Sequence, residues 1–121
     1  MKRTSHGRAS CPIARSLDVI GDWWTLLIVR DTLRGDRRFG ELQRSLGVAK
    51  NILTTRLHRL VDDGILELVP ADDGSAYQQY RLTAKGRDLA PVVRSLRNWG
   101  REHLMTPAEA RAHELHMAAR E

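Results

Sequence analysis

The chain has 121 residues, of which 41% are hydrophobic and 29% are charged, a size that fits one globular domain with a small core of its own. Residues 1–59 carry 12 basic and 5 acidic side chains, whereas residues 60–121 carry 8 basic and 10 acidic ones. The positive charge therefore belongs to the N-terminal half, which favours a polyanionic partner. The single cysteine, Cys11, excludes an intramolecular disulfide and a multi-cysteine metal centre.

No apolar run is long enough to cross a bilayer, and the polar residues 1–7 are not followed by the apolar core of a signal peptide. We therefore expect a cytoplasmic protein without a membrane partner. Residues 1–10 are basic, small and polar, which is typical of a flexible arm.

Helical patterns begin at Pro12. The spacing predicts a short helix over residues 12–20, because Pro suits the first helical turn and Gly21 ends the pattern. Asp22 is a good N-cap for the next helix, expected over residues 23–34. That segment is apolar enough to form the central helix of the core, and we expect these residues to be buried there: Trp23, Trp24, Leu27, Ile28 and Leu33.

Two further helices are predicted over residues 39–46 and from Ala49 to about Asp63, separated by Gly47. In the second of these, Leu53, Leu57 and Leu60 share one face, and a polar, partly basic face lies opposite. The period then changes: residues 65–69 and 77–82 are short strand-like runs, and the turn-forming residues 70–76 between them predict a β-hairpin.

The C-terminal part predicts helices again. Thr83 is a candidate cap for one helix of roughly 20 residues, about 30 Å long, whose apolar side chains recur at three- and four-residue spacing. A helix of that length has more apolar surface than so small a domain covers, so we expect a partner chain on it. Thr106, Pro107 and Glu109 form the pattern of a capping box before a last short helix within residues 106–121.

This order of elements is that of a winged helix-turn-helix: a mainly α fold with a small β-hairpin, classed as α+β. The major groove of DNA admits one α-helix whose outward side chains contact base edges, while Lys and Arg neutralise phosphates. The expected DNA-binding residues are Arg38, Lys50, Asn51, Thr54, Thr55, Arg56, His58, Arg59 and Arg81. Asn51 is the first choice for reading a base, because its amide can pair with adenine in a bidentate way. We do not expect phosphate contact at the hairpin tip, which carries Asp72 and Asp73.

The chain also resembles the HxlR-type transcriptional regulators over about residues 11–104. The residues that carry the resemblance are Cys11-Pro12-Ile13, the segments 21–30 and 38–42, Leu53-Thr54-Thr55-Arg56-Leu57, Asp63-Gly64-Ile65-Leu66 and the segment 80–86. The resemblance implies a dimeric winged-helix repressor or activator that binds operator DNA, with the terminal helices forming the dimer. The expected dimerisation residues are Ile13, Leu17, Leu89, Val92, Val93, Leu96, Trp99 and His103. Ala49 departs from the family, which usually has a capping Ser at that position.

Cys11 lies directly before Pro12, at the expected start of the first helix, where backbone N–H groups and the helix dipole favour a thiolate. The resemblance implies that a cysteine at this position can sense oxidants or electrophiles, and a small buried interface residue is the alternative. His113 and His116 are spaced for a shared metal, but no completing ligand set is present, so we expect no metal site and no cofactor.

We therefore predict a homodimeric DNA-binding transcriptional regulator, by preference a repressor, and not an enzyme. Its operator is expected to be an inverted repeat. It is expected to be built as an arm (1–10), a winged helix-turn-helix domain with dimerisation helices (11–105) and a C-terminal helix (106–121). The expected effector is a thiol-reactive compound or a small ligand at the dimer interface. The alternative is a winged-helix adaptor that contacts an acidic protein and has no specific DNA binding.

Overall fold

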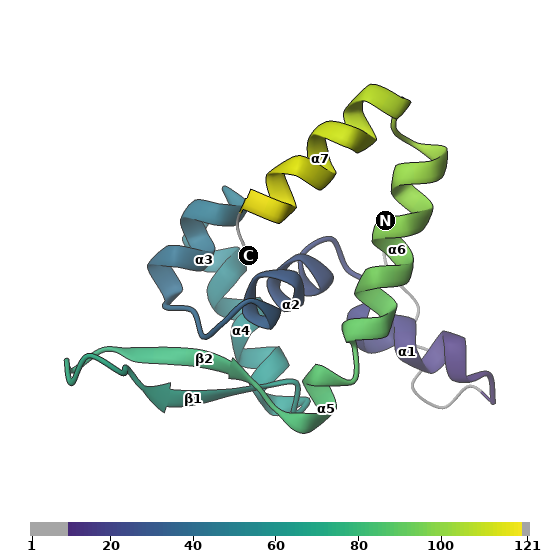
Figure 1. Ribbon diagram of the computed structural model, residues 1–121. Coiled ribbons are helices and arrows are strands. Elements are labelled where there is room, and N and C mark those ends of the chain that lie inside the picture. The colour runs from purple at the N-terminus through teal and green to yellow at the C-terminus, as the bar shows by residue number, and fades with distance from the viewer. Residues whose placement is uncertain (1–9, 120–121) are drawn as a thin grey trace. The chain divides into compact units, whose positions relative to one another are not determined.

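A computed structural model describes residues 10–119 of the chain (Figure 1). These residues form two compact units, one up to Ala90 and one from Pro91, and each is described by itself. In the first unit the elements are α1 (Pro12–Ile20), α2 (Thr25–Leu33), α3 (Phe39–Leu46), α4 (Lys50–Asp62), β1 (Leu66–Pro70), β2 (Gln78–Leu82) and α5 (Ala84–Arg87). The second unit holds α6, which begins at the boundary (Ala90–His103), and α7 (Pro107–Ala119). The predicted helices over residues 12–20 and 39–46 are confirmed to the residue.

The core of the first unit is aliphatic. Ile28 and Val29 of α2 are fully buried, as is Leu42 of α3. The leucine stripe of α4 joins them, as predicted, and the remaining buried apolar side chains come from the turn after α3 and from the hairpin: Val48, Ile65, Leu66, Ala71 and Leu82. One face of each of α2, α3 and α4 is therefore fixed against the others by apolar burial.

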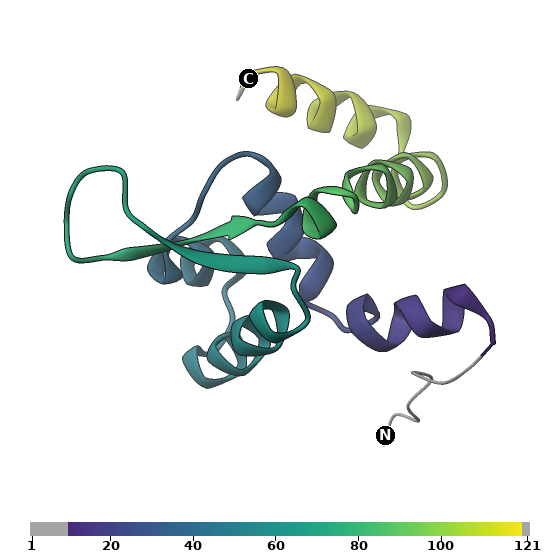
Figure 2. The ribbon, with the colours of Figure 1, turned by 90° about the horizontal axis from the view of Figure 1, so that it is seen from below.

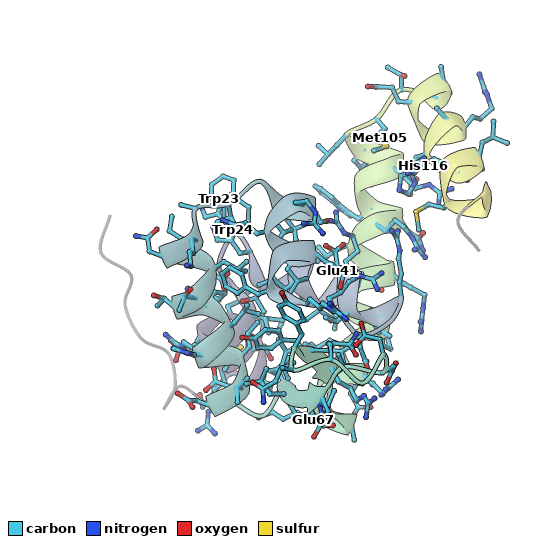
Figure 3. All side chains as sticks on the ribbon, turned by 90° about the vertical axis from the view of Figure 1, so that its left-hand side faces the viewer. Trp23, Trp24, Glu41, Glu67, Met105 and His116 are labelled. Carbon is cyan, nitrogen blue, oxygen red and sulfur yellow. The ribbon has the colours of Figure 1, made fainter. Side chains whose placement is uncertain are left out.

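The tryptophan pair is not part of this core, which corrects our expectation. Helix α2 begins at Thr25, so Trp23 and Trp24 lie in the turn before it, and the side chain of Trp23 is 90% exposed. Leu33, at the end of α2, is 36% exposed. Asp22 still acts at the start of the helix, as predicted: its carboxylate accepts the backbone N–H groups of Trp24 and Thr25. The regular helix begins two residues later than the apolar pattern indicates. Figure 3 shows both rings at one end of this unit, with Glu67 of the hairpin at the other.

The β-hairpin is confirmed. Strands β1 and β2 pair antiparallel, with Leu66 opposite Leu82 and Pro70 opposite Gln78. Its turn projects beyond the helices, on the side away from α1 (Figures 1 and 2). The backbones of Arg37 and Tyr80 exchange two hydrogen bonds, of 3.1 and 2.7 Å, so the segment before α3 pairs with β2 for one residue. The hairpin is thus attached to the helix-turn-helix.

The prediction of a single long helix after Thr83 is wrong. Helix α5 has four residues, Asp88 and Leu89 form a turn, and α6 follows with 14 residues, a length of about 21 Å. Pro91 explains the break, because it has no N–H for the carbonyl of Arg87 and its ring would collide with that group in a continuous helix. Pro91 is accepted in the first turn of α6.

Helix α7 confirms the predicted capping box. Glu109 accepts the backbone N–H of Thr106 at 2.9 Å, and the Thr106 hydroxyl accepts the N–H of Glu109 at 3.2 Å. Within this unit Arg101 of α6 pairs with Glu114 of α7, which ties the two helices together.

Gly86 allows α5 to approach the start of the hairpin. A Cβ at this position would lie 2.2 Å from the carbonyl oxygen of Ile65 and 2.9 Å from Cδ2 of Leu82. Thr83 fixes the same place: its hydroxyl donates to the carbonyls of Gly64 and Ile65 and accepts the N–H of Gly86.

We expect Gly86→Ala to lower the free energy of unfolding by about 1–3 kcal/mol, because the added methyl group meets backbone that is itself hydrogen-bonded. Urea denaturation followed by circular dichroism measures this. Gly40→Ala is the matched control, since its Cβ would meet only Arg44 Nη1, at 3.6 Å, and it should be neutral or stabilise by up to about 1 kcal/mol. Equal stabilities of the two variants would contradict the close approach of α5.

Candidate nucleic-acid interface

Helices α3 and α4 form a helix-turn-helix whose turn is fixed locally. Glu41 accepts the backbone N–H of Arg38 at 2.8 Å, which starts α3. Gly47 ends it with φ 64°, a left-handed conformation that glycine adopts without strain, and Val48 is buried beneath the turn. The N-cap of α4, Ala49, provides no side-chain hydrogen bond, as its methyl group dictates.

The exposed face of α4 brings together most of the polar residues predicted to bind DNA. At 3.6 residues per turn, Asn51, Thr55 and His58 lie opposite the buried leucine stripe, and all three are exposed. Lys50 is exposed in the first turn, and Thr54 is half-buried on the adjoining side. The hydroxyls of Thr54 and Thr55 donate to the carbonyls of Lys50 and Asn51, which leaves their oxygens free to accept a further hydrogen bond.

The two predicted arginines of α4 lie on one flank of the helix and bind groups near the junction of α1 and α2. Arg56 Nη1 is 3.4 Å from Asp22 Oδ2. Arg59 Nη2 donates to the carbonyl of Asp18 at 3.3 Å, and its Nε is 3.6 Å from Asp63 Oδ2. These guanidinium groups therefore already have partners within the chain.

Arg38 and Arg81 have acidic partners around the hairpin. Arg38 pairs with Asp73 at the hairpin tip and lies over the ring of Tyr77, 4.9 Å from its centroid. Arg81 donates to Asp36 Oδ2 from Nε (3.1 Å) and Nη2 (2.8 Å). Hydrogen bonds from Ser75, with the Arg38 guanidinium beside it, lower the pKa of Asp73 to about 2. Asp36 in turn raises the pKa of Arg81 above its ordinary value.

The acidic partners of these arginines and one apolar residue of α4 were not predicted from the sequence. Asp22 and Arg56 are far apart in the sequence, as are Arg38 and Asp73, so no local pattern indicates that they meet. Ile52, which is 46% exposed beside Asn51, could have been found on the helical wheel. An apolar side chain at this place is suited to contact the methyl group of thymine.

The second unit carries an exposed apolar face on α6. Val92, Leu96 and Trp99 are all exposed there, at 38%, 50% and 56%, and with Pro91 and Ser95 they line an open depression. His103, also exposed, lies against Trp99 with ring centroids 5.2 Å apart. Val93 is half-buried. Figure 3 labels Met105 and His116 in this unit.

The other predicted dimerisation residues and the thiol lie in the first unit. Ile13 and Leu17 are exposed on α1, and Leu89 is half-buried in the turn after α5. Cys11 is the N-cap of α1 and is exposed. Within residues 10–119, no group of three His, Cys, Asp or Glu side chains has an arrangement that could hold a metal ion. No helix of this described part is long and apolar enough to span a membrane.

Comparison with known proteins identifies the family. The model of the HxlR-like helix-turn-helix family matches residues 19–108, a range that contains α2 through α6. The chain belongs to this family. The recognised resemblance to HxlR-type regulators and the predicted fold class are thereby confirmed.

Several relatives and solved structures are similar to this chain. An HTH-type transcriptional regulator of Mycobacterium tuberculosis is 41% identical over 103 residues, which are 85% of this chain and 65% of that protein. The chain thus spans slightly less than two thirds of the length of this relative. The crystal structure of PA1607, described as a candidate transcription factor, superposes with a TM-score of 0.79 and 57% identity over 86% of this chain and 72% of the other.

A redox regulator, HypR, is also similar to this HxlR-like chain. In its reduced form it superposes with a TM-score of 0.69 and 31% identity, covering 76% of this chain and 92% of its own. The family and the matching relatives are transcriptional regulators, which are not enzymes.

Proposed function

We propose that this chain is a transcriptional regulator that binds double-stranded DNA in a sequence-specific way, with α4 as the recognition helix. One observation carries the proposal: the face of α4 opposite its buried leucines presents Asn51, Thr55 and His58 together, directly after the fixed turn of the helix-turn-helix. In this motif the N-terminal residues of the second helix contact base edges. The family and the names of its relatives support the same function.

The residues of the proposed interface have separate roles. Asn51 reads a base, Ile52 contacts a thymine methyl group, and Thr54, Thr55 and His58 contact base edges or phosphate. Lys50, exposed at the start of α4, neutralises a phosphate. Asp62 is exposed on the same face of α4, one turn after His58. The surface of α4 that faces the phosphates ends at this residue.

The proposal is tested by selection of duplexes from a random library with the reduced wild-type chain at physiological salt. Enrichment of one sequence that resists random competitor DNA supports a specific regulator, and binding without enrichment favours the adaptor alternative. On the enriched duplex, Asn51→Ala should lose about 5- to 150-fold in affinity, the range of one bidentate base contact, with little change on random DNA. Arg87→Met, which alters an exposed cation of α5, is the control and should keep the specific affinity.

We further propose that the chain is a homodimer held through α6 and α1. Its two recognition helices then bind successive turns of an inverted repeat, and the dimer acts as a repressor. The exposed Val92, Leu96 and Trp99 of α6 support it, because apolar side chains that recur on one helical face are stabilised by burial. Leu89 and Val93, together with Ile13 and Leu17 of α1, are expected to extend this interface.

Leu96→Glu should convert the dimer to a monomer, because it places a charge in the middle of the apolar face. Sedimentation velocity over a range of concentrations measures the change. Arg94→Glu, on the opposite side of α6, is the matched control and should leave the mass unchanged. A wild-type chain that is already monomeric at all concentrations would contradict the dimer.

Redox sensing through Cys11 is a second, dependent proposal. It is supported by the exposure of the thiol at the N-terminus of α1 and by the similarity to the redox regulator HypR. Diamide or a quinone is expected to release DNA from the wild-type chain and to have no effect on Cys11→Ser, as measured by fluorescence anisotropy. A full response of Cys11→Ser would show that the thiol is not the sensor.

A further inference from the structure

Asp22 lies at the junction of α1 and α2 and has four partners. Its Oδ1 accepts the backbone N–H groups of Trp24 (2.8 Å) and Thr25 (2.9 Å). Its Oδ2 accepts the hydroxyl of Thr25 and faces Arg56 Nη1 of α4 at 3.4 Å. One carboxylate therefore starts α2 and also binds the helix proposed to enter the major groove.

The ion pair is sheltered from water. The side chain of Asp22 is 11% exposed and that of Arg56 is 23% exposed. Burial raises the pKa of Asp22, but the hydrogen bonds from Thr25 and Trp24 and the charge of Arg56 together outweigh it, so that the net effect lowers the pKa. Asp22 is thus ionised at neutral pH, and movement of Arg56 toward a phosphate would leave this half-buried carboxylate without its cation.

A second arginine of α4 acts at the same junction. Arg59 is three residues after Arg56 on the same flank, and it donates to the carbonyl of Asp18 in the last turn of α1. Carbonyl groups at the C-terminus of a helix favour a cation. Two contacts, one turn apart, therefore hold this flank of α4 against residues 18–22, while Asn51, Thr55 and His58 face away from the core.

We propose that Asp22 and Arg56 are positioning residues that set the rotation of the recognition helix about its own axis, and that Arg56 does not bind a DNA phosphate. The leucine stripe fixes which side of α4 is buried but packs without strict directionality, whereas a hydrogen-bonded ion pair on one flank is directional. This inference rests on the proposed function, because it gives α4 the role of reading DNA.

The salt dependence of DNA binding separates a phosphate contact from a positioning contact. Each phosphate that a protein neutralises contributes about 0.9 to the slope of log K against log salt concentration. Arg56→Met should therefore leave this slope unchanged on random duplex DNA, while the ratio of affinities for the enriched duplex and random duplex falls about tenfold. Lys50→Met is the comparison: it should reduce the slope by about 0.9 and weaken binding to both duplexes alike.

Asp22→Asn tests the same pair from the other side and leaves Arg56 in place. Its side-chain oxygen can still accept the N–H groups that start α2. We expect the ratio of affinities for the enriched and random duplexes to fall as it does in Arg56→Met. The double variant, Asp22→Asn with Arg56→Met, should show no larger fall in this ratio than either single variant. Circular dichroism and thermal unfolding of each variant verify that the helices are retained.

Two results would overturn the inference. A slope that falls by about 0.9 in Arg56→Met, together with tighter binding by Asp22→Asn, would show that Arg56 contacts phosphate and that Asp22 competes for it. An unchanged slope with an unchanged ratio would show that the pair does not position α4. If the wild-type chain enriches no sequence, the proposed function itself fails and this inference with it. Enrichment combined with either of the first two results removes only the inference.

Discussion

The burial of the leucine stripe of α4 is the constraint on which the rest of the first unit depends. Leu53, Leu57 and Leu60 are fully or almost fully buried and share the core with Ile28 and Val29 of α2 and with Leu66 and Leu82 of the hairpin. Each fully buried aliphatic side chain contributes about 1.5–3 kcal/mol relative to exposure, so this burial determines which side of α4 faces the core. The polar face of α4 is directed outward as a consequence.

Ion pairs within the first unit distribute the positive charge of the N-terminal half. Arg38, Arg56 and Arg81 each have a carboxylate from another element, and Arg59 has one from the end of its own helix. These pairs attach the hairpin to the start of α3 and attach α4 to the junction of α1 and α2. A count of the basic residues along the sequence therefore overstates the number of cations that are available to a polyanion. The exposed surface of α4 combines two cations, Lys50 and Arg59, and the acidic Asp62 with neutral side chains that donate and accept hydrogen bonds, a composition suited to reading base edges rather than to attraction alone.

The exposed apolar side chains lie outside the core that forms the helix-turn-helix. Helix α6 shows them in its own unit, and α1 shows Ile13 and Leu17 in the other. Both helices are amphipathic, yet neither has a fully buried residue within the single chain. Surfaces of this kind are typical of association between chains, and they agree with the dimer that we propose. Cys11 begins one of these two helices, so a chemical change at the thiol would occur beside a surface that is apolar and exposed.

Local signals in the sequence were sufficient for most of the elements. Pro12, Gly47 and the capping box of Thr106 and Glu109 determine where helices begin and end, because they act through backbone hydrogen bonds within a few residues. The strand-like runs and turn residues of the hairpin and the leucine spacing of α4 are equally local, and together with the family motifs they predicted the fold class and the polar face of the recognition helix. The break at Asp88 and Leu89 was also readable, since Pro91 excludes a continuous helix, but the apolar spacing on either side obscured it.

The tertiary structure decided what distant residues do to one another. Trp23 has the apolar side chain of a core residue, yet it lies in the turn before α2 and is exposed. Arg56 and Arg81 were predicted from the sequence to bind DNA, whereas folding places Asp22 and Asp36 beside them. An ion pair depends on the distance between side chains that lie tens of residues apart, and no periodicity encodes that distance. The sequence by itself thus determined the elements and their faces, and only the folded chain determined which charges are paired.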